Sequence, residues 1–189
     1  KLLRAKINAL LNRRRERLQN REMRSRLAEY EPHTLIGESL PIQALRELIE
    51  QLAVSEATVF ITGESGVGKE VVARALHQAS TRSHRDFITV NCAALSAGLL
   101  ESELFGHEKG AFTSAHDRRI GMFEKAKDGT LLLDEVTEIE TELQAKLLRA
   151  LQEKHVQRVG SSDLIPVDVR IIATTNRSPE AAVSEGRLR

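Results

Sequence analysis

The sequence has few of the features that mark secreted, membrane or zinc-binding proteins. Its 189 residues include one cysteine, Cys92, so no internal disulfide can form, which fits a reducing compartment. No apolar run reaches the roughly 18 residues that a membrane-spanning helix needs. Charges interrupt the apolar positions of the basic N-terminus, unlike a signal peptide, and the six histidines show no zinc-like spacing. We therefore expect a cytoplasmic protein without a membrane contact or a metal-ligand cluster.

Charge is nearly balanced over the whole chain but uneven along it. The net charge is +1, with 41% hydrophobic and 29% charged residues, and the length suits one α/β domain. Residues 1–30 instead hold ten Lys or Arg against three Asp or Glu, around a leucine stripe that predicts one or two helices. Because the heptads are imperfect, three interpretations stay open: a linker helix pairing weakly with a partner helix, the last helix of a neighbouring domain, or a nucleic-acid arm.

Residues 59–71, VFITGESGVGKEV, are the organising stretch. They predict a buried strand, a glycine-rich turn and the first turn of a helix, with the spacing G-x-x-x-x-G-K of a phosphate-binding loop. Glycines let the backbone curl around an anion, and the helix dipole and Lys69 add positive charge. The usual motif ends in Ser or Thr, whereas this one ends in Glu70. The alternative is a glycine-rich turn without a ligand.

A second segment, GTLLLDE at residues 129–135, is an apolar run that ends in two carboxylates. Such a run predicts a central parallel strand, and polar residues at its carboxyl end lie where open α/β sheets place their sites. We expect Asp134 to hold Mg²⁺ through water and Glu135 to polarise the attacking water. A helix N-cap with an acidic first turn is the alternative.

Two further strands are predicted at residues 86–91 and 169–176, and both end in polar residues. Asn91 is a hydrogen-bonding residue near the site or a turn-forming asparagine, while Cys92 and Ala93 are expected to pack. The pair Thr175 and Asn176 could sense a γ-phosphate. One amphipathic helix is predicted to start at Ser39 and Pro41, with Leu48 on its apolar face. A second is predicted over residues 141–153.

Residues 101–115, ESELFGHEKGAFTSA, start as a helix that Gly106 and Gly110 break. A phenylalanine between small and polar residues is not typical of a core, so Phe112 predicts a contact surface, the alternative being a loop with one tucked-in ring. Residues 155–158 and 164–168 flank a Gly-Ser-Ser-Asp turn and predict a hairpin.

Taken together, GESGVGKE, ELFGHEKGAFTSA, GTLLLDE, VRIIATTN and LIGES resemble the AAA+ domain of bacterial enhancer-binding proteins, the activators of sigma-54 RNA polymerase. The resemblance implies an α/β fold: a three-layer αβα P-loop NTPase with a central parallel sheet over residues 32–189. A helical linker, residues 1–31, would precede it and could include the last helix of a receiver domain. The family's C-terminal helical lid is absent, so the domain looks truncated.

The resemblance also implies roles for individual residues. Asp134 and Glu135 match Walker B, Asn91 the residue that switches the catalytic glutamate, Thr175 and Asn176 sensor I, and Arg189 the first trans-acting arginine. The resemblance assigns nucleotide binding to two groups of residues. Ile36 and Gly37 would line the adenine, and the Walker A stretch would bind the phosphates through Gly63, Glu64, Ser65, Gly66, Val67, Gly68, Lys69, Glu70 and Val71. Contact with sigma-54 falls to Gly110, Ala111, Phe112, Thr113, Ser114 and Ala115, where Ser114 replaces the family's second glycine.

Two functions follow from this resemblance. The first is an ATP- and Mg²⁺-dependent transcriptional activator domain that remodels sigma-54 RNA polymerase from a ring, typically a hexamer, with DNA bound through a domain absent from this chain. The second is a nucleotide-binding module that self-associates, as a dimer through its N-terminal helices, without turnover.

Overall fold

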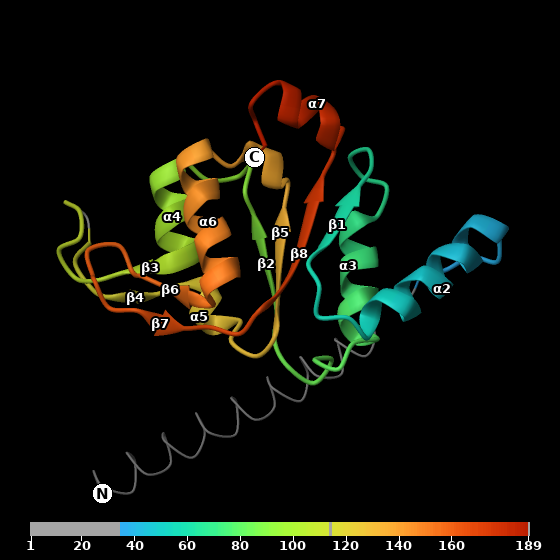
Figure 1. Ribbon diagram of the computed structural model, residues 1–189, viewed down its shortest axis with the longest axis horizontal. Helices are drawn as coiled ribbons and strands as arrows, with labels where there is room; N and C mark the ends of the chain where they lie inside the picture. Colours follow the sequence, from blue (N-terminus) through green and yellow to red (C-terminus); the bar gives the residue numbers. More distant parts are fainter. Residues whose placement is uncertain (1–34, 114, 189) are drawn as a thin grey trace, which may run out of the picture. The chain divides into compact units, whose positions relative to one another are not determined.

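A computed structural model describes residues 35–113 and 115–188 (Figure 1). At its centre lies a four-stranded sheet with the order β1-β8-β5-β2, in which every pairing is parallel. These strands are β1 (Val59–Thr62), β2 (Phe87–Asn91), β5 (Thr130–Asp134) and β8 (Arg170–Thr175). The helices and the turn of 3₁₀-helix are α2 (Leu40–Ala53), α3 (Lys69–Gln78), α4 (Ala97–Phe105), α5 (Met122–Lys125), η1 (Val136–Glu138), α6 (Thr141–Glu153) and α7 (Pro179–Ser184). The helical linker predicted for residues 1–31 lies outside the described residues.

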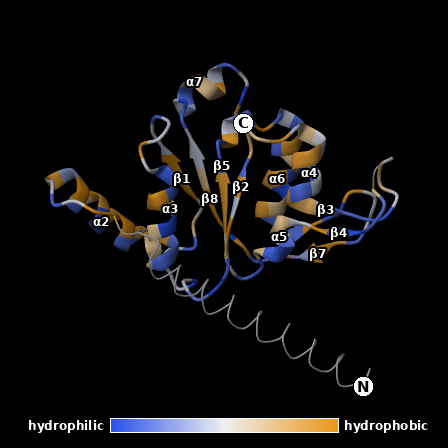
Figure 2. Cartoon of the chain, turned by 180° about the vertical axis from the view of Figure 1, so that it is seen from behind, coloured by the Kyte–Doolittle hydropathy of each residue, from blue (hydrophilic) through white to orange (hydrophobic). Residues whose placement is uncertain are grey.

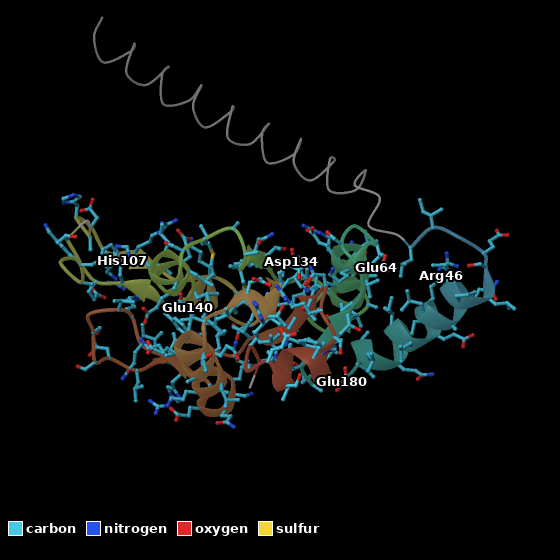
Figure 3. All side chains as sticks on the ribbon, turned by 90° about the horizontal axis from the view of Figure 1, so that it is seen from above. Arg46, Glu64, His107, Asp134, Glu140 and Glu180 are labelled. Atoms are coloured by element: carbon cyan, nitrogen blue, oxygen red, sulfur yellow. The ribbon has the colours of Figure 1, made fainter. Side chains whose placement is uncertain are left out.

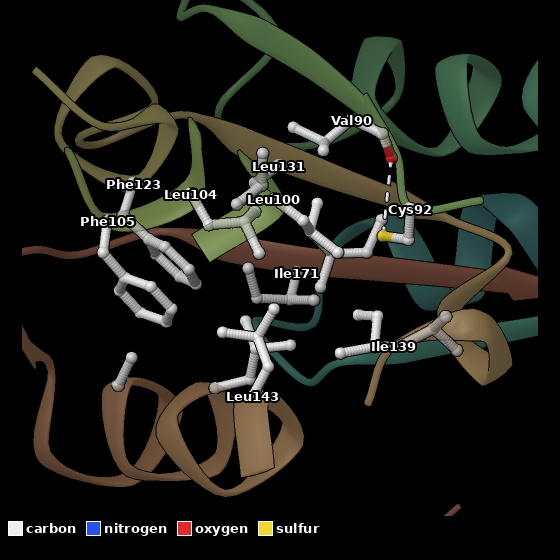
Figure 4. Packing of buried hydrophobic residues seen from close by; sticks show 14 of the residues in the cluster. Val90, Cys92, Leu100, Leu104, Phe105, Phe123, Leu131, Ile139, Leu143 and Ile171 are labelled. Atoms are coloured by element: carbon white, nitrogen blue, oxygen red, sulfur yellow. Dashed lines mark hydrogen bonds between the residues drawn. The ribbon is translucent and has the colours of Figure 1, made fainter. Parts of the chain in front are cut away.

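Helices cover both faces of the sheet, which gives the predicted three-layer αβα arrangement. One hydrophobic cluster joins the sheet to α4, α5 and α6, and Figure 4 shows part of it. A second cluster, on the opposite face, joins the sheet to α2 and α3. In Figure 2 β1 and β5 are coloured largely as hydrophobic, whereas β8 is paler toward its carboxyl end, where two threonines follow its apolar residues.

Strand β5 shows why a continuous apolar run suits the centre of such a sheet. Leu131 and Leu133 enter the cluster under α4 and α6, whereas Leu132 enters the cluster under α3. Successive side chains of a strand point to opposite faces, so a strand covered on both sides needs apolar residues at every position. Each fully buried leucine contributes about 1.5–3 kcal/mol to folding. The prediction of a buried central strand is confirmed.

The sequence was misleading at four places. Strand β1 is not buried, since it pairs only with β8 among the described strands, and Phe60 exposes 39% of its surface. Helix α4 begins at Ala97 instead of Glu101, because it packs through Leu100 and Leu104. Leu48 of α2 is 48% exposed. Ala93 is exposed as well, although its neighbour Cys92 is buried, and burial raises the pKa of that thiol to about 12.

Two small antiparallel pairs extend from one side of the domain, away from β1 and α3 (Figure 1). The first joins β3 (Gly106–His107) to β4 (Arg119–Ile120), and the second joins β6 (His155–Val156) to β7 (Ile165–Pro166). The second pair is the hairpin predicted from the sequence. A bridge between His107 and Val159 links the two pairs. None of the helices within residues 35–113 and 115–188 combines the length and apolar character that a bilayer span requires.

Candidate functional site: a phosphate loop and a distant contact loop

Residues 63–69, here called the phosphate loop, connect the end of β1 to the start of α3. Gly66 and Gly68 adopt φ angles of 80° and 95°, in the left-handed region that favours glycine. At Gly63 a Cβ would lie 3.0 Å from the Cγ2 atom of Val67, closer than ordinary contact. The loop therefore curls as tightly as its G-x-x-x-x-G-K spacing predicts, and it delivers Lys69 to the first turn of α3.

Lys69 joins the phosphate loop to the end of β5. Its Nζ atom donates hydrogen bonds to the carbonyl oxygens of Gly63, at 2.9 Å, and Glu64, at 3.1 Å. The same nitrogen lies 3.4 Å from Oε1 of Glu135, and Lys69 is only 8% exposed. A buried ammonium beside the positive end of a helix is well placed to bind an anion.

Asp134, the last residue of β5, has both carboxylate oxygens held by neighbouring strands. Oγ1 of Thr174 on β8 donates to Oδ1 at 2.5 Å, and Nδ2 of Asn91 on β2 donates to Oδ2 at 3.4 Å. Asn91 thus contacts Asp134, its partner in the β2–β5 register, and not Glu135. Its Oδ1 accepts the backbone N–H groups of Ala93 and Ala94. The turn-forming interpretation of Asn91 therefore holds alongside its place near the site.

Glu135 leaves β5 in a left-handed conformation, with φ of 55°. A non-glycine residue takes this conformation only where its surroundings hold it. Here its N–H donates to Oγ1 of Thr174 at 3.2 Å, and its Oε2 accepts the N–H of Asn176 at 2.9 Å. Together with the ion pair to Lys69, these bonds fix the carboxylate between the phosphate loop and the end of β8.

The two threonines at the end of β8 have different partners. The hydroxyl of Thr175 lies 2.9 Å from that of Thr137, and only the backbone oxygen of Thr175 meets the phosphate loop, accepting the N–H of Gly63 at 3.2 Å. Thr174 is the residue that contacts both acidic positions, through the carboxylate of Asp134 and the backbone N–H of Glu135, and it was not predicted from the sequence. The alternation of side chains along a strand was the available signal, because only one of two adjacent threonines can face a given neighbour.

The donor set fits a nucleoside triphosphate with a divalent cation. The glycine turn, the helix N-terminus and Lys69 suit phosphate oxygens, and the carboxylates of Asp134 and Glu135 suit a hard cation or a polarised water. Glu70, at the position usually held by Ser or Thr, forms an ion pair with Arg74 at 2.8 Å. Figure 3 places Glu64 of the phosphate loop and Asp134 in neighbouring parts of the domain, with His107 well apart from both.

The remaining predicted nucleotide residues are less enclosed. Ile36 is 81% exposed, and the carbonyl oxygen of Gly37 accepts a hydrogen bond from Arg46 at 2.8 Å. Their assignment to an adenine pocket stays a prediction. Arg189, predicted to act in trans, lies outside the described residues.

Residues 110–115, here called the contact loop, lie in the connection between β3 and β4. The N–H of Gly110 donates to the oxygen of Ala115 at 2.8 Å, which closes the base of the loop. Phe112 is 41% exposed and Thr113 is exposed, as predicted, whereas Ala115 is buried. Ser114 lies outside the described residues. Figures 1 and 3 show that this region is remote from the phosphate loop.

An ion-pair cluster fastens the β6–β7 hairpin to α5 and to the segment before the contact loop. The guanidinium of Arg158 contacts both oxygens of Glu124, at 2.8 and 2.5 Å, and Oε1 of Glu108 at 2.8 Å. The hydrogen bonds to Glu124 and then to Glu108 raise the pKa of Arg158, despite the opposing effect of burial. The N–H of Glu108 also donates to the oxygen of Val159 at 3.0 Å. The sequence did not single out Glu108 or Glu124, because they lie 50 and 34 residues from Arg158 along the chain.

Comparison with known proteins supplies the family. Residues 35–189 match the model described as the sigma-54 interaction domain. The chain belongs to this family. It is 56% identical over 155 residues to the transcriptional regulatory protein ZraR of Escherichia coli (strain K12), covering 82% of this chain and 35% of that protein. It is 52% identical over 174 residues to the regulatory protein DctD of Pseudomonas aeruginosa, covering 91% and 38%. The chain thus spans about a third of the length of these relatives.

Solved structures give the same fold. The structure of NtrX from Brucella abortus in complex with ATP matches with a TM-score of 0.78 at 38% identity, covering 91% of this chain and 39% of that one. The P-loop NTPase domain of a sigma-54 transport activator from E. coli matches with a TM-score of 0.55 at 19% identity, covering 82% and 87%. This sigma-54 interaction domain therefore has the P-loop NTPase fold, as predicted.

Gly160 tests how closely the hairpin of this sigma-54 interaction domain packs on the contact loop. It has φ of 81°, and a Cβ there would lie 2.8 Å from the Cβ of Ala111. We expect Gly160→Ala to lower the free energy of unfolding by about 2–4 kcal/mol, from left-handed strain plus overpacking. Gly186→Ala is the matched control, because Gly186 has φ of 70° and no atom within 4 Å of the added Cβ. Equal losses in urea unfolding would contradict the packing argument.

Proposed function

We propose that this chain is the ATP-hydrolysing motor of a sigma-54-dependent transcriptional activator, and that it remodels the sigma-54 RNA polymerase holoenzyme so that the promoter opens. The observation that carries the proposal is the contact between Lys69 and Glu135, at 3.4 Å, which joins a phosphate loop to the carboxylate end of β5. The membership of the sigma-54 interaction domain family and the likeness to NtrX in complex with ATP support it.

Each residue of the site has a role in this proposal. Lys69 and the backbone of the phosphate loop bind the β- and γ-phosphates of ATP. Asp134 would hold Mg²⁺ through water, and the ion would supply positive charge for the phosphates. Glu135 orients and polarises the attacking water, and Thr174 fixes both acids. Asn91 switches the catalytic glutamate, Thr175 and Asn176 sense the γ-phosphate, and Ile36 and Gly37 line the adenine.

The assembly proposed for the active form is a cytoplasmic ring, typically a hexamer, in which Arg189 of one subunit reaches the nucleotide of the next. DNA is bound through another domain of the complete protein. Steady-state ATPase measured against protein concentration tests this: turnover per subunit should rise cooperatively as rings form. ATP binding with no turnover at any concentration would instead support the self-associating module.

Phe112 tests the partner. In the full-length protein, Phe112→Ala should weaken capture of sigma-54 by roughly tenfold or more, because burying a phenylalanine contributes about 1.5–3 kcal/mol. ATP affinity should stay unchanged, since the contact loop is remote from the phosphate loop (Figure 3). The measurement is pull-down of sigma-54 with a transition-state analogue of ATP. Val183→Ala, on α7 and 54% exposed, is the control. Undiminished capture by the Phe112 variant would remove the contact loop from the mechanism.

A further inference from the structure

The exposed ring of Phe112 rests on a histidine. The centroids of the Phe112 and His107 rings are 4.9 Å apart, with an interplanar angle of 63°. Aromatic rings prefer this edge-to-face arrangement over face-to-face stacking. Phe112 is 41% exposed, whereas His107 is only 8% exposed. The ring of Phe112 is therefore half-packed, with a buried imidazole as its support.

Ser102 holds that imidazole in place. Its Oγ lies 2.7 Å from Nδ1 of His107, and Ser102 is itself buried on α4. The backbone around His107 is equally constrained, because His107 pairs with Arg119 of β4 and forms a bridge with Val159. A buried side-chain hydrogen bond holds its partners more firmly than an exposed one. Helix α4 thus sets the orientation of the ring on which Phe112 rests.

The backbone hydrogen bonds of the contact loop do not fix the orientation of the Phe112 ring. The N–H of Ala111 donates to the oxygen of Glu108 at 3.1 Å, and the N–H of Ala115 donates to the oxygen of Phe112 at 2.9 Å. These bonds close the loop but leave the side-chain torsions of Phe112 free. Within residues 35–113 and 115–188, the contact with His107 is the one ring pairing that Phe112 makes.

We propose that His107, oriented by Ser102, is a positioning residue that presents Phe112 to its partner in a single orientation. The identity of that partner, sigma-54, rests on the function proposed above, whereas the hold on the ring does not. Presenting a ring already ordered lowers the entropy lost on binding. Removing the hydrogen bond from Ser102 should therefore loosen Phe112 and weaken capture without touching the phosphate loop.

The absence of tryptophan from the chain gives a direct reporter. In a Phe112→Trp background, the single indole reports its own exposure through acrylamide quenching. We expect Ser102→Ala and His107→Leu each to raise the quenching constant by about twofold, because the first removes the hydrogen bond that orients the imidazole and the second removes the imidazole itself. His116→Ala should leave it unchanged, because His116 lies in the same segment but is exposed. Unchanged quenching in both test variants, with folding verified by thermal unfolding, would overturn the proposal.

Capture of sigma-54 provides the second measurement, made in the full-length protein with Phe112 intact. Ser102→Ala and His107→Leu should each reduce capture several-fold while ATP affinity by calorimetry stays at the parental value. A loosened ring with parental capture would show that orientation does not matter, and the proposal would fail. If the parental protein itself captured no sigma-54, the proposed function would fail, and the quenching measurement would still decide whether His107 holds Phe112.

Discussion

Replacing Lys69 with alanine is expected to abolish ATP binding in calorimetry. The change removes the ammonium that donates to the carbonyl oxygens of Gly63 and Glu64 and pairs with Glu135. Hydrogen bonds with a charged donor or acceptor are about twice as strong as neutral ones, and the site would keep the carboxylate of Glu135, which repels the phosphates. We expect affinity to fall by at least about 100-fold, which corresponds to roughly 2.7 kcal/mol.

Two controls separate loss of charge from loss of structure. Lys125→Ala removes a charge from an exposed lysine on α5 and should leave ATP affinity at the parental value. Thermal unfolding of the Lys69 variant checks whether the protein stays folded, since Lys69 also donates hydrogen bonds to two carbonyl oxygens of the phosphate loop. A folded Lys69→Ala protein with parental affinity would falsify the assignment of the nucleotide site.

The fold was predictable wherever one segment carries its own signal. The run GTLLLD gave β5 because every position is apolar, and the spacing of Leu143 and Leu147 gave α6 with its observed limits, residues 141–153. Among the strands that the structure describes, β1 pairs with β8 alone. This position was not predictable, since the same apolar residues suit a strand with one neighbour or with two. Edge and centre are decided by the order of strands that are distant in sequence.

In the candidate site, too, the residues within one segment were predictable and the contacts between segments were not. The phosphate loop carries its geometry in its own glycines, so its residues were found. Of the two partners of Asp134, Asn91 was expected near the site, whereas Thr174 was missed. Their contacts with Asp134 depend on register between strands, because Thr174 is 40 residues away and Asn91 is 43 residues away. The hold of Ser102 on His107 spans only five residues, yet it needs the turn after α4 to bring the two together. The sequence gives the chemistry of each side chain, whereas contacts between side chains on different helices and strands can be known only from the folded structure.

Glu135→Gln is expected to keep ATP affinity and to lose hydrolysis. Glutamine has the shape of glutamate, and its amide oxygen can still accept the N–H of Asn176, now bonded to Oε2 at 2.9 Å. An amide is a poor base, however, and losing a general base typically costs about 10²- to 10⁴-fold in rate. Loss of the ion pair at 3.4 Å leaves Lys69 free for phosphate, so affinity should hold or rise slightly.

The measurement is a comparison of ATP affinity and steady-state turnover in the full-length protein under conditions that give ring assembly. Glu138→Gln serves as the matched control, because Glu138 lies on η1, three residues further on, and pairs with Arg177 at 2.9 Å. That variant should retain turnover, since its partner belongs to the turn after β8 and not to the phosphate loop. If Glu135→Gln turned over ATP at nearly the parental rate, another group must activate the water. Asp134 would then be the next group to test, because its carboxylate lies beside Glu135 and the hydroxyl of Thr174 contacts both residues.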